Sequence, residues 1–106
     1  MQFVTLIPIC RNNGEAVDQA ELDAIIRKLW VTFGGCSIDG PVEGHWVDSQ
    51  TGVHYQDACL RATVVCDNNR LTEAETAVIE IGRQLAQEAM FFEVRDFDGV
   101  RFLRTK

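Results

Sequence analysis

The feature that most constrains the fold is a pair of amphipathic helical stripes separated by a long segment of strand-forming residues. The first stripe consists of Leu22, Ile25, Ile26, Leu29 and Phe33, and the second of Ala74, Val78, Ile81, Leu85 and Ala89, with Ala77 beside it. A helix with one apolar stripe must bury that stripe against another layer, so the strand-like segments are expected to form a sheet under both helices.

Local signals mark the ends of both helices. Asp18 with Glu21 and Thr72 with Glu75 have the spacing of capping boxes. The pair Gly34-Gly35 is typical of a helix stop. We therefore predict one helix between Asp18 and Gly34 and a second from about Glu73 to Met90.

Alternating or β-rich runs predict the strands. They cover Phe3–Ile9, about Val42–Asp48, Val53–Cys66, Phe91–Phe97 and Val100–Arg104. Pro8 indicates that the first strand is at an edge or near its end there. Asp98-Gly99 is a two-residue hairpin signal, in whose register Asp96 faces Arg101 and Glu93 faces Arg104.

This order predicts a single α+β domain over residues 1–106. The fold class is a ferredoxin-like sandwich, with β-α-β-β-α-β order plus an extra C-terminal strand and an antiparallel sheet with two helices on one face. At 106 residues the chain buries roughly two-thirds of its unfolded surface, and it needs no metal or disulfide to be stable.

Charge and cysteine usage restrict the partners. The chain has 10 Lys+Arg against 16 Asp+Glu and a formal net charge of -6, which disfavours binding to nucleic acids and to anionic membranes. The four cysteines, at positions 10, 36, 59 and 66, show no CxxC spacing, and we expect reduced thiols. With neither a signal peptide nor a membrane-spanning stretch expected, the chain is predicted to be cytoplasmic and without a cofactor.

The segment from Phe33 to Tyr55 is the most distinctive part of the chain. It contains both histidines, one of the two tryptophans and five of the eight glycines. If residues 49–52 close a hairpin, Trp46 faces Tyr55, His45 faces Gln56, and His54 lies diagonally near His45.

The candidate catalytic residues are His45 and His54 with a carboxylate from Glu43, Asp57 or Glu88. Two imidazoles and a carboxylate suit acid-base chemistry or a divalent metal. Strand alternation places Glu43 on the face of the histidines and Asp57 on the other face, unless a bulge intervenes. The competing interpretation is that both histidines line a half-buried sheet surface, and no metal is predicted.

Three weaker candidates have structural explanations. Cys36 or Cys59 beside a histidine suggests a nucleophile, but a helix C-terminus before Cys36 destabilises a thiolate. Gly34-Gly35 follows a helix and therefore offers no helix N-terminus to a phosphate. For Gln87-Glu88 a structural hydrogen-bonding role is favoured over a functional one.

Aromatic residues exceed what one sheet face can bury. They are Trp46, Tyr55, Phe91, Phe92, Phe97 and Phe102. Because strand alternation sends some rings to the face without helices, we expect an apolar patch there and association of two copies into a dimer. The competing interpretation is that the last hairpin or the loops cover these rings within one molecule.

Short motifs give a resemblance that covers most of the chain. Phe33-Gly34-Gly35, Gly44-x-Trp46, Gly52-Val53-x-Tyr55-x-Asp57 and Gln87-Glu88-Ala89 resemble a family of uncharacterised bacterial and phage proteins of about this length. The family pattern has threonine after the paired glycines, where this chain has Cys36-Ser37. The resemblance implies an order of elements and a link to mobile elements, and it implies no established activity.

Two functions follow from these observations. The favoured one is a non-catalytic dimeric domain that binds a partner protein or a small apolar ligand through an aromatic sheet face with Trp46, Tyr55, His45 and His54. The alternative is a small hydrolase or isomerase that uses His45 and His54 with one of the three carboxylates, with or without a metal ion. Whether the chain is an enzyme stays open, with binding preferred over catalysis.

Overall fold

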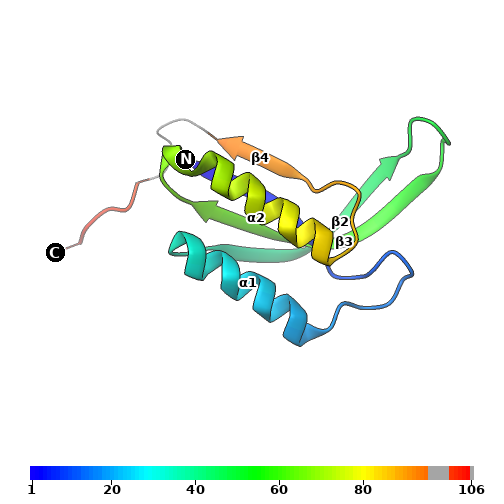
Figure 1. Cartoon of the computed structure of the whole chain (residues 1–106), viewed down its shortest axis with the longest axis horizontal. Helices are drawn as coiled ribbons and strands as arrows, with labels where there is room; N and C mark the ends of the chain where they lie inside the picture. Colours follow the sequence, from blue (N-terminus) through cyan, green and yellow to red (C-terminus); the bar gives the residue numbers. More distant parts are fainter. Residues whose placement is uncertain (96–100, 106) are drawn as a thin grey trace.

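The computed structural model describes residues 1–95 and 101–105 and contains a four-stranded antiparallel sheet with both helices on one face (Figure 1). The elements are β1 Gln2–Pro8, α1 Gln19–Phe33, β2 Ser37–Val47, β3 His54–Val65, the 3-10 turn η1 Asn68–Arg70, α2 Leu71–Gln84 and β4 Phe92–Arg95. The strand order is β2-β3-β1-β4. The predicted ferredoxin-like α+β fold is therefore confirmed.

β1 is a central strand, and its alternation defines the two faces of the sheet. Phe3, Thr5 and Ile7 have no exposed surface and point to the helices. Their partners on β3 continue this apolar layer, with Phe3 opposite Val64 and Thr5 opposite Ala62. Side chains one residue out of step lie on the other side, which no helix covers and which we call the open face.

Both helices bury most of the residues in the stripes that the sequence predicts. Leu22, Ile25, Leu29 and Phe33 of α1 and Ala74, Val78 and Ile81 of α2 are buried in one core with the inner face of the sheet. The rings of Phe3 and Phe33 meet edge to face with centroids 5.3 Å apart. Gly34 ends α1 in the left-handed conformation, as predicted, and its N–H donates to Trp30 O.

The predicted capping boxes are wrong at both helices. Asp18 is the N-cap of α1 but makes no side-chain capping bond, because the Glu21 carboxylate accepts hydrogen bonds from Arg11 and Gln84 instead. α2 begins at Leu71 after η1, so its N-cap is Arg70, whose guanidinium binds the Glu73 carboxylate. Ion pairs in the first turns thus replace the expected side-chain caps.

α2 also ends at Gln84, six residues before the predicted Met90. Leu85 stays buried at the C-cap, but Ala86 adopts a positive φ of 55° and turns the chain away from the helix axis. Gln87 N–H then donates to Gly82 O, which closes the turn. Ala89, which the sequence assigned to the apolar stripe, therefore lies beyond the helix and is exposed, so that part of the prediction is wrong.

β2 begins at Ser37, five residues earlier than predicted. Ile38 lies opposite Ala62 on the helix-covered face, but the register shifts between Asp39 and Val42. This irregularity interrupts the alternation, so the first part of the strand was not recognisable in the sequence. Beyond it, β2 and β3 continue as a two-stranded hairpin that projects past the helices, and we call residues 42–59 the arm (Figure 1).

The predicted extra C-terminal strand is absent from the part of the tail that the structure describes. Residues 101–105 have no strand structure, and the predicted turn at Asp98-Gly99 lies outside the described residues. Glu93 pairs with Arg95, two residues along β4, rather than with the predicted partner Arg104. Exposed cross-strand ion pairs contribute only a few tenths of a kcal/mol and are too weak to specify a strand by themselves.

Pro8 lies at the end of its strand, as predicted. It is the last residue of β1, and β4 pairs with β1 only as far as Thr5.

Within residues 1–95 and 101–105, neither helix is long and apolar enough to cross a membrane.

Candidate functional site

The turn of the arm is organised by one carboxylate. Asp48 Oδ1 accepts hydrogen bonds from the backbone N–H groups of Gln50 and Thr51 at 2.8 and 3.0 Å. These two bonds favour the ionised form and lower the pKa of Asp48. Gly52 follows with a φ of +71°, so the turn suits a residue without a side chain there. The turn fixes the register in which the two strands meet.

The register brings both histidines together as predicted. His45 lies opposite Gln56, and His45 Nδ1 is 2.9 Å from His54 Nε2. His45 Nε2 is 2.9 Å from Glu43 Oε2, whose other oxygen accepts a bond from Gln56 Nε2 at 2.7 Å. We call these four side chains the polar face of the arm. The contact with His45 lowers the pKa of Glu43.

The opposite face of the arm carries the aromatic pair. Trp46 and Tyr55 face each other across the strands, as predicted, with ring centroids 4.5 Å apart and planes inclined by 17°. Trp46 Nε1 donates to Asp57 Oδ2 at 3.0 Å. Asp57 is therefore held by the indole and does not join the histidines, in agreement with the predicted strand alternation.

The third candidate carboxylate, Glu88, lies elsewhere. It is exposed in the connector between α2 and β4, and the described part of the chain shows no contact between it and either histidine. Its neighbour Gln87 donates to Asn12 Oδ1 at 3.1 Å and to Leu85 O at 3.2 Å. The predicted structural hydrogen-bonding role therefore fits Gln87.

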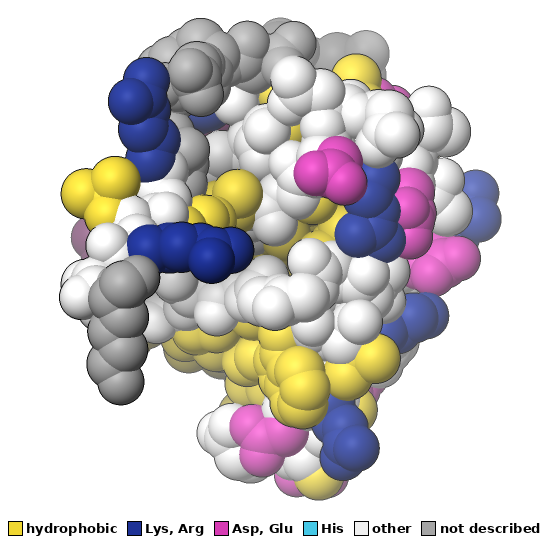
Figure 2. Space-filling view, turned by 90° about the vertical axis from the view of Figure 1, so that its left-hand side faces the viewer, with side chains coloured by type: hydrophobic (Ala, Val, Ile, Leu, Met, Phe, Trp, Pro, Cys, Tyr) yellow, Lys and Arg dark blue, Asp and Glu magenta, His cyan; other side chains and the backbone are white. Residues whose placement is uncertain are grey.

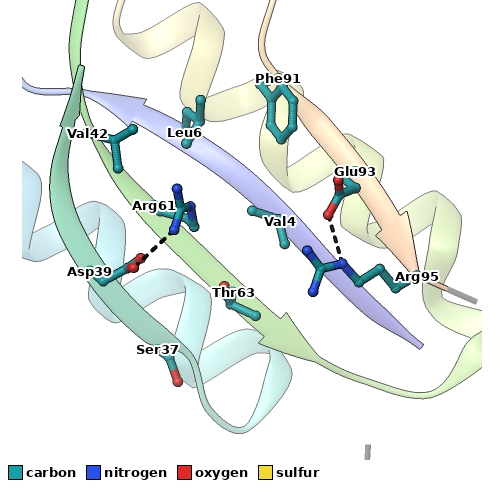
Figure 3. Close-up of a pocket in the computed structure, with 10 residues that line it drawn as sticks. All are labelled: Val4, Leu6, Ser37, Asp39, Val42, Arg61, Thr63, Phe91, Glu93 and Arg95. Carbon is teal, nitrogen blue, oxygen red and sulfur yellow. Dashed lines mark hydrogen bonds and ion pairs between the residues drawn. The ribbon is translucent and has the colours of Figure 1, made fainter. Parts of the chain in front are cut away.

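The open face of the sheet contains a groove of about 710 Å³, shown in Figure 3. Its floor is formed by Val4 and Leu6 of β1 and by Thr63 of β3. Val4 keeps only 5% of its surface exposed although no helix covers it, because longer side chains on the neighbouring strands shield it. Phe91, which is half exposed, lies at one end of the groove.

Two ion pairs stand on opposite sides of this groove (Figure 3). Arg61 Nη1 on β3 lies 3.2 Å from Asp39 Oδ2 on β2, and Arg95 Nε on β4 lies 2.9 Å from Glu93 Oε1 on the same strand. The groove therefore presents two guanidinium groups and two carboxylates with no net charge. Its volume is in the range of small-molecule sites in proteins.

Apart from Phe91, the residues that line this groove were not predicted from the sequence. Arg61 lies next to the inward-facing Ala62 on β3 and therefore lies on the open face, but the groove also requires the start of β2 and the shielding of Val4. Of the aromatic residues expected on the open face, Phe91 lines the groove, whereas Phe92 packs against Phe3 with centroids 5.5 Å apart.

The remaining aromatic residues of the tail do not extend this patch in the described structure. Phe102 is 83% exposed, and Phe97 lies outside the described residues. On the end of the molecule shown in Figure 2, hydrophobic side chains lie exposed among acidic and basic ones. This is a mixed surface rather than a field of one sign.

The thiols have no activated position among the described residues. Burial raises the pKa of Cys36, Cys59 and Cys66, which keeps these groups protonated. Cys10 is exposed. In residues 1–95 and 101–105, no group of three or more His, Cys, Asp or Glu side chains is arranged to hold a metal ion.

Comparison with known proteins gives a likeness of fold. No family model matches the sequence, and no curated protein matches it significantly. Among solved structures, a phage SAM lyase in complex with S-methyl-5′-thioadenosine is similar, with a TM-score of 0.65 and 12% sequence identity. The match covers 86% of this chain and 76% of the lyase chain. The chain thus shares the architecture of that small α+β protein.

Proposed function

We propose that the chain is a non-catalytic binding domain that takes a small, uncharged or zwitterionic ligand with a planar ring in the groove on its open sheet face. The observation that carries this proposal is a shielded apolar floor between two ion pairs, Asp39 with Arg61 and Glu93 with Arg95. Such a combination suits a ligand that has both an apolar body and hydrogen-bonding groups.

The groove offers two kinds of contact, stacking surfaces and hydrogen-bond acceptors. The exposed ring of Phe91 and the guanidinium planes of Arg61 and Arg95 are suitable surfaces for stacking a planar heterocycle. The carboxylates of Asp39 and Glu93 are acceptors for hydroxyl groups. Because each guanidinium already faces a carboxylate, a multiply charged phosphate would meet as much repulsion as attraction.

The structural likeness supports a nucleoside with a thioether. The phage SAM lyase of similar fold was solved with S-methyl-5′-thioadenosine, which has a purine ring, ribose hydroxyls and an uncharged sulfur. This chemistry matches the apolar floor and the flanking acceptors of the groove. We therefore propose S-methyl-5′-thioadenosine, or a close analogue, as the ligand class.

Three further properties belong to the same proposal. Exposed Trp46 and Tyr55 on the arm support association of two copies through their sheets. Four free thiols support a cytoplasmic location. The family resemblance of the Phe33-Gly34-Gly35 and Gly44-x-Trp46 motifs, with its link to phage and mobile elements, stays a prediction.

The alternative is a hydrolase or isomerase centred on the arm. The hydrogen-bonded series of Glu43, His45 and His54 favours it, since a carboxylate that orients an imidazole is a common arrangement for a general base. Against it, the side chain of His45 is 47% exposed and that of Glu43 is 66% exposed, so this series lies on an open surface. The ion pairs of the groove are exposed to a similar degree, with Arg61 at 45% and Asp39 at 63%. The groove is preferred because its floor is shielded, with Val4 only 5% exposed.

The proposal is tested by calorimetric titration of the full chain with S-methyl-5′-thioadenosine and, separately, with ATP. We expect saturable binding of the nucleoside and much weaker binding of ATP. Arg61→Gln removes a charged hydrogen-bond donor, worth about 1.5–3 kcal/mol, and is expected to weaken nucleoside binding by roughly 10-fold or more.

Lys28→Gln is the matched control, because Lys28 forms an exposed ion pair with Glu80 on the helix side of the molecule. It should leave nucleoside binding unchanged. Absence of binding at millimolar nucleoside, or equal effects of the two variants, would contradict the groove as the site. Conversion of S-adenosylmethionine to S-methyl-5′-thioadenosine by the purified chain would overturn the non-catalytic role.

A further inference from the structure

The polar face of the arm has a chemistry that the groove does not use. Gln56, Glu43, His45 and His54 are linked in that order by three contacts of 2.7, 2.9 and 2.9 Å. They come from both strands of the arm, so the ladder between β2 and β3 fixes their relative positions. The series ends in two imidazole nitrogens that face each other.

The hydrogen-bond roles follow from the carboxylate. An ionised Glu43 only accepts, so His45 Nε2 must carry the hydrogen of the contact between them. His45 Nδ1 is then an unprotonated acceptor in the neutral ring, and His54 Nε2 donates to it. Glu43 thereby sets the tautomer of His45 and directs its lone pair toward His54.

We propose that His45 Nδ1 and His54 Nε2 together bind a divalent transition-metal ion, with Glu43 as the residue that positions His45. Zinc lies about 2.0–2.1 Å from imidazole nitrogens, so two nitrogens of a tetrahedral site are about 3.3–3.4 Å apart. The present separation of 2.9 Å is close to that value. Because the two nitrogens point at each other, the rings must separate by about 0.4–0.5 Å and also tilt until both lone pairs converge on one ion. Exposed side chains on a two-stranded arm can make both movements.

The proton balance of binding is simple. The hydrogen on His54 Nε2 leaves to solvent, and the same ring takes up one proton at Nδ1, so a neutral pair stays neutral.

The donor set selects the kind of ion. Imidazole nitrogens suit Zn²⁺, Ni²⁺ and Cu²⁺, whereas Mg²⁺ and Ca²⁺ require several oxygen ligands. Glu43 is turned toward His45, in the arrangement by which a carboxylate orients a metal-bound histidine. Only two ligands come from the protein, and water fills the other coordination positions. We therefore expect a moderate affinity for the metal ion.

The test is a calorimetric titration of Cys10→Ser full-length chain with Ni²⁺ and with Mg²⁺, since Cys10 is an exposed thiol that also binds soft metals. We expect one Ni²⁺ per chain and no Mg²⁺. His45→Ala and His54→Ala should each reduce Ni²⁺ affinity at least about 10-fold, and Glu43→Gln should reduce it about 10-fold. The ¹⁵N resonances of both imidazoles should shift when one equivalent of Zn²⁺ is added in place of Ni²⁺.

Asp57→Asn is the matched control, because Asp57 is on the same arm but on its aromatic face, and asparagine retains an acceptor for Trp46. It should leave Ni²⁺ affinity unchanged. The proposal is overturned if Ni²⁺ does not bind, or if it binds with the same affinity after both histidine substitutions. None of these outcomes depends on nucleoside binding in the groove.

Discussion

The arm and the helix-covered part of the sheet share two strands but are held together by different interactions. Under the helices, inward side chains such as Phe3, Ile7 and Val64 have no exposed surface. In the arm, Trp46 and Tyr55 stay half exposed, and contacts between neighbouring side chains hold both faces. Burial therefore stabilises one half of the hairpin, and cross-strand pairs organise the other.

This difference decides where chemistry is available. A side chain inside the core is surrounded by apolar groups and serves stability, whereas a polar side chain on the arm remains accessible to ions and ligands. The groove lies between these extremes, because Val4 is shielded while Arg61 and Arg95 remain partly exposed.

Phe3→Ala is expected to give the largest loss of stability. Phe3 is fully buried and contacts the rings of Phe33 and Phe92, so its removal leaves a cavity. Truncation of a buried phenylalanine lowers the free energy of unfolding by about 3–5 kcal/mol. Urea denaturation followed by circular dichroism measures it, and Phe3→Leu provides a milder variant if Phe3→Ala does not fold.

Trp46→Ala is the comparison on the arm. It removes one ring of an exposed pair, and such pairs contribute only about 0.5–1.5 kcal/mol. If Trp46→Ala and Phe3→Ala lower the free energy of unfolding equally, the arm is as much a part of the core as β1, and the contrast fails.

The second prediction concerns the junction of the two regions. Gly40 has a φ of +127°, and a Cβ there would lie 3.0 Å from Cys59 O and 3.1 Å from Val42 N. Gly40→Ala therefore combines backbone strain with a clash against backbone atoms that have little freedom to move. We expect a loss of about 1–3 kcal/mol in the free energy of unfolding.

Gly35→Ala is the matched control for this prediction, since no atom lies within 4 Å of a Cβ at that position. Its unfolding midpoint in urea should stay close to that of the unchanged chain. If Gly40→Ala had the same unfolding midpoint as Gly35→Ala, the strand irregularity would relax freely and would not constrain where the arm starts.

The sequence was informative wherever one period continued without interruption. The stripe of α1 predicted the buried face of that helix, and the hairpin register correctly paired Trp46 with Tyr55. Helix and strand periods survive in sequence because most inward positions are apolar. The ferredoxin-like order could therefore be inferred without tertiary information.

Prediction failed where a tertiary contact replaced a local signal. Glu21 has the right position for a capping box, but its carboxylate binds Arg11 and Gln84. α2 stops because Ala86 turns with a positive φ, a conformation that alanine does not signal. The groove was missed for a related reason, because its walls come from β2, β3 and β4, whose mutual positions depend on the whole sheet.

The last prediction has the smallest effect and concerns the turn of the arm at acid pH. Hydrogen bonds from Gln50 and Thr51 lower the pKa of Asp48 in the folded turn. A carboxyl group with a lowered folded-state pKa stabilises the structure above its unfolded value of about 3.8, and this contribution is lost as the pH falls through the folded value. The turn should therefore loosen below about pH 4 and stay intact at neutral pH.

Amide resonances of Gln50 and Thr51, followed by NMR from pH 7 to pH 3, measure this change. We expect them to shift toward values of an open turn, while amides of buried β1 residues such as Ile7 keep their native shifts. Asp48→Asn keeps an acceptor oxygen but does not titrate, so it should remove the pH dependence of the two turn amides. If these amides move identically in Asp48→Asn, another group controls the turn, and the arm responds to pH together with the rest of the sheet rather than through its own carboxylate.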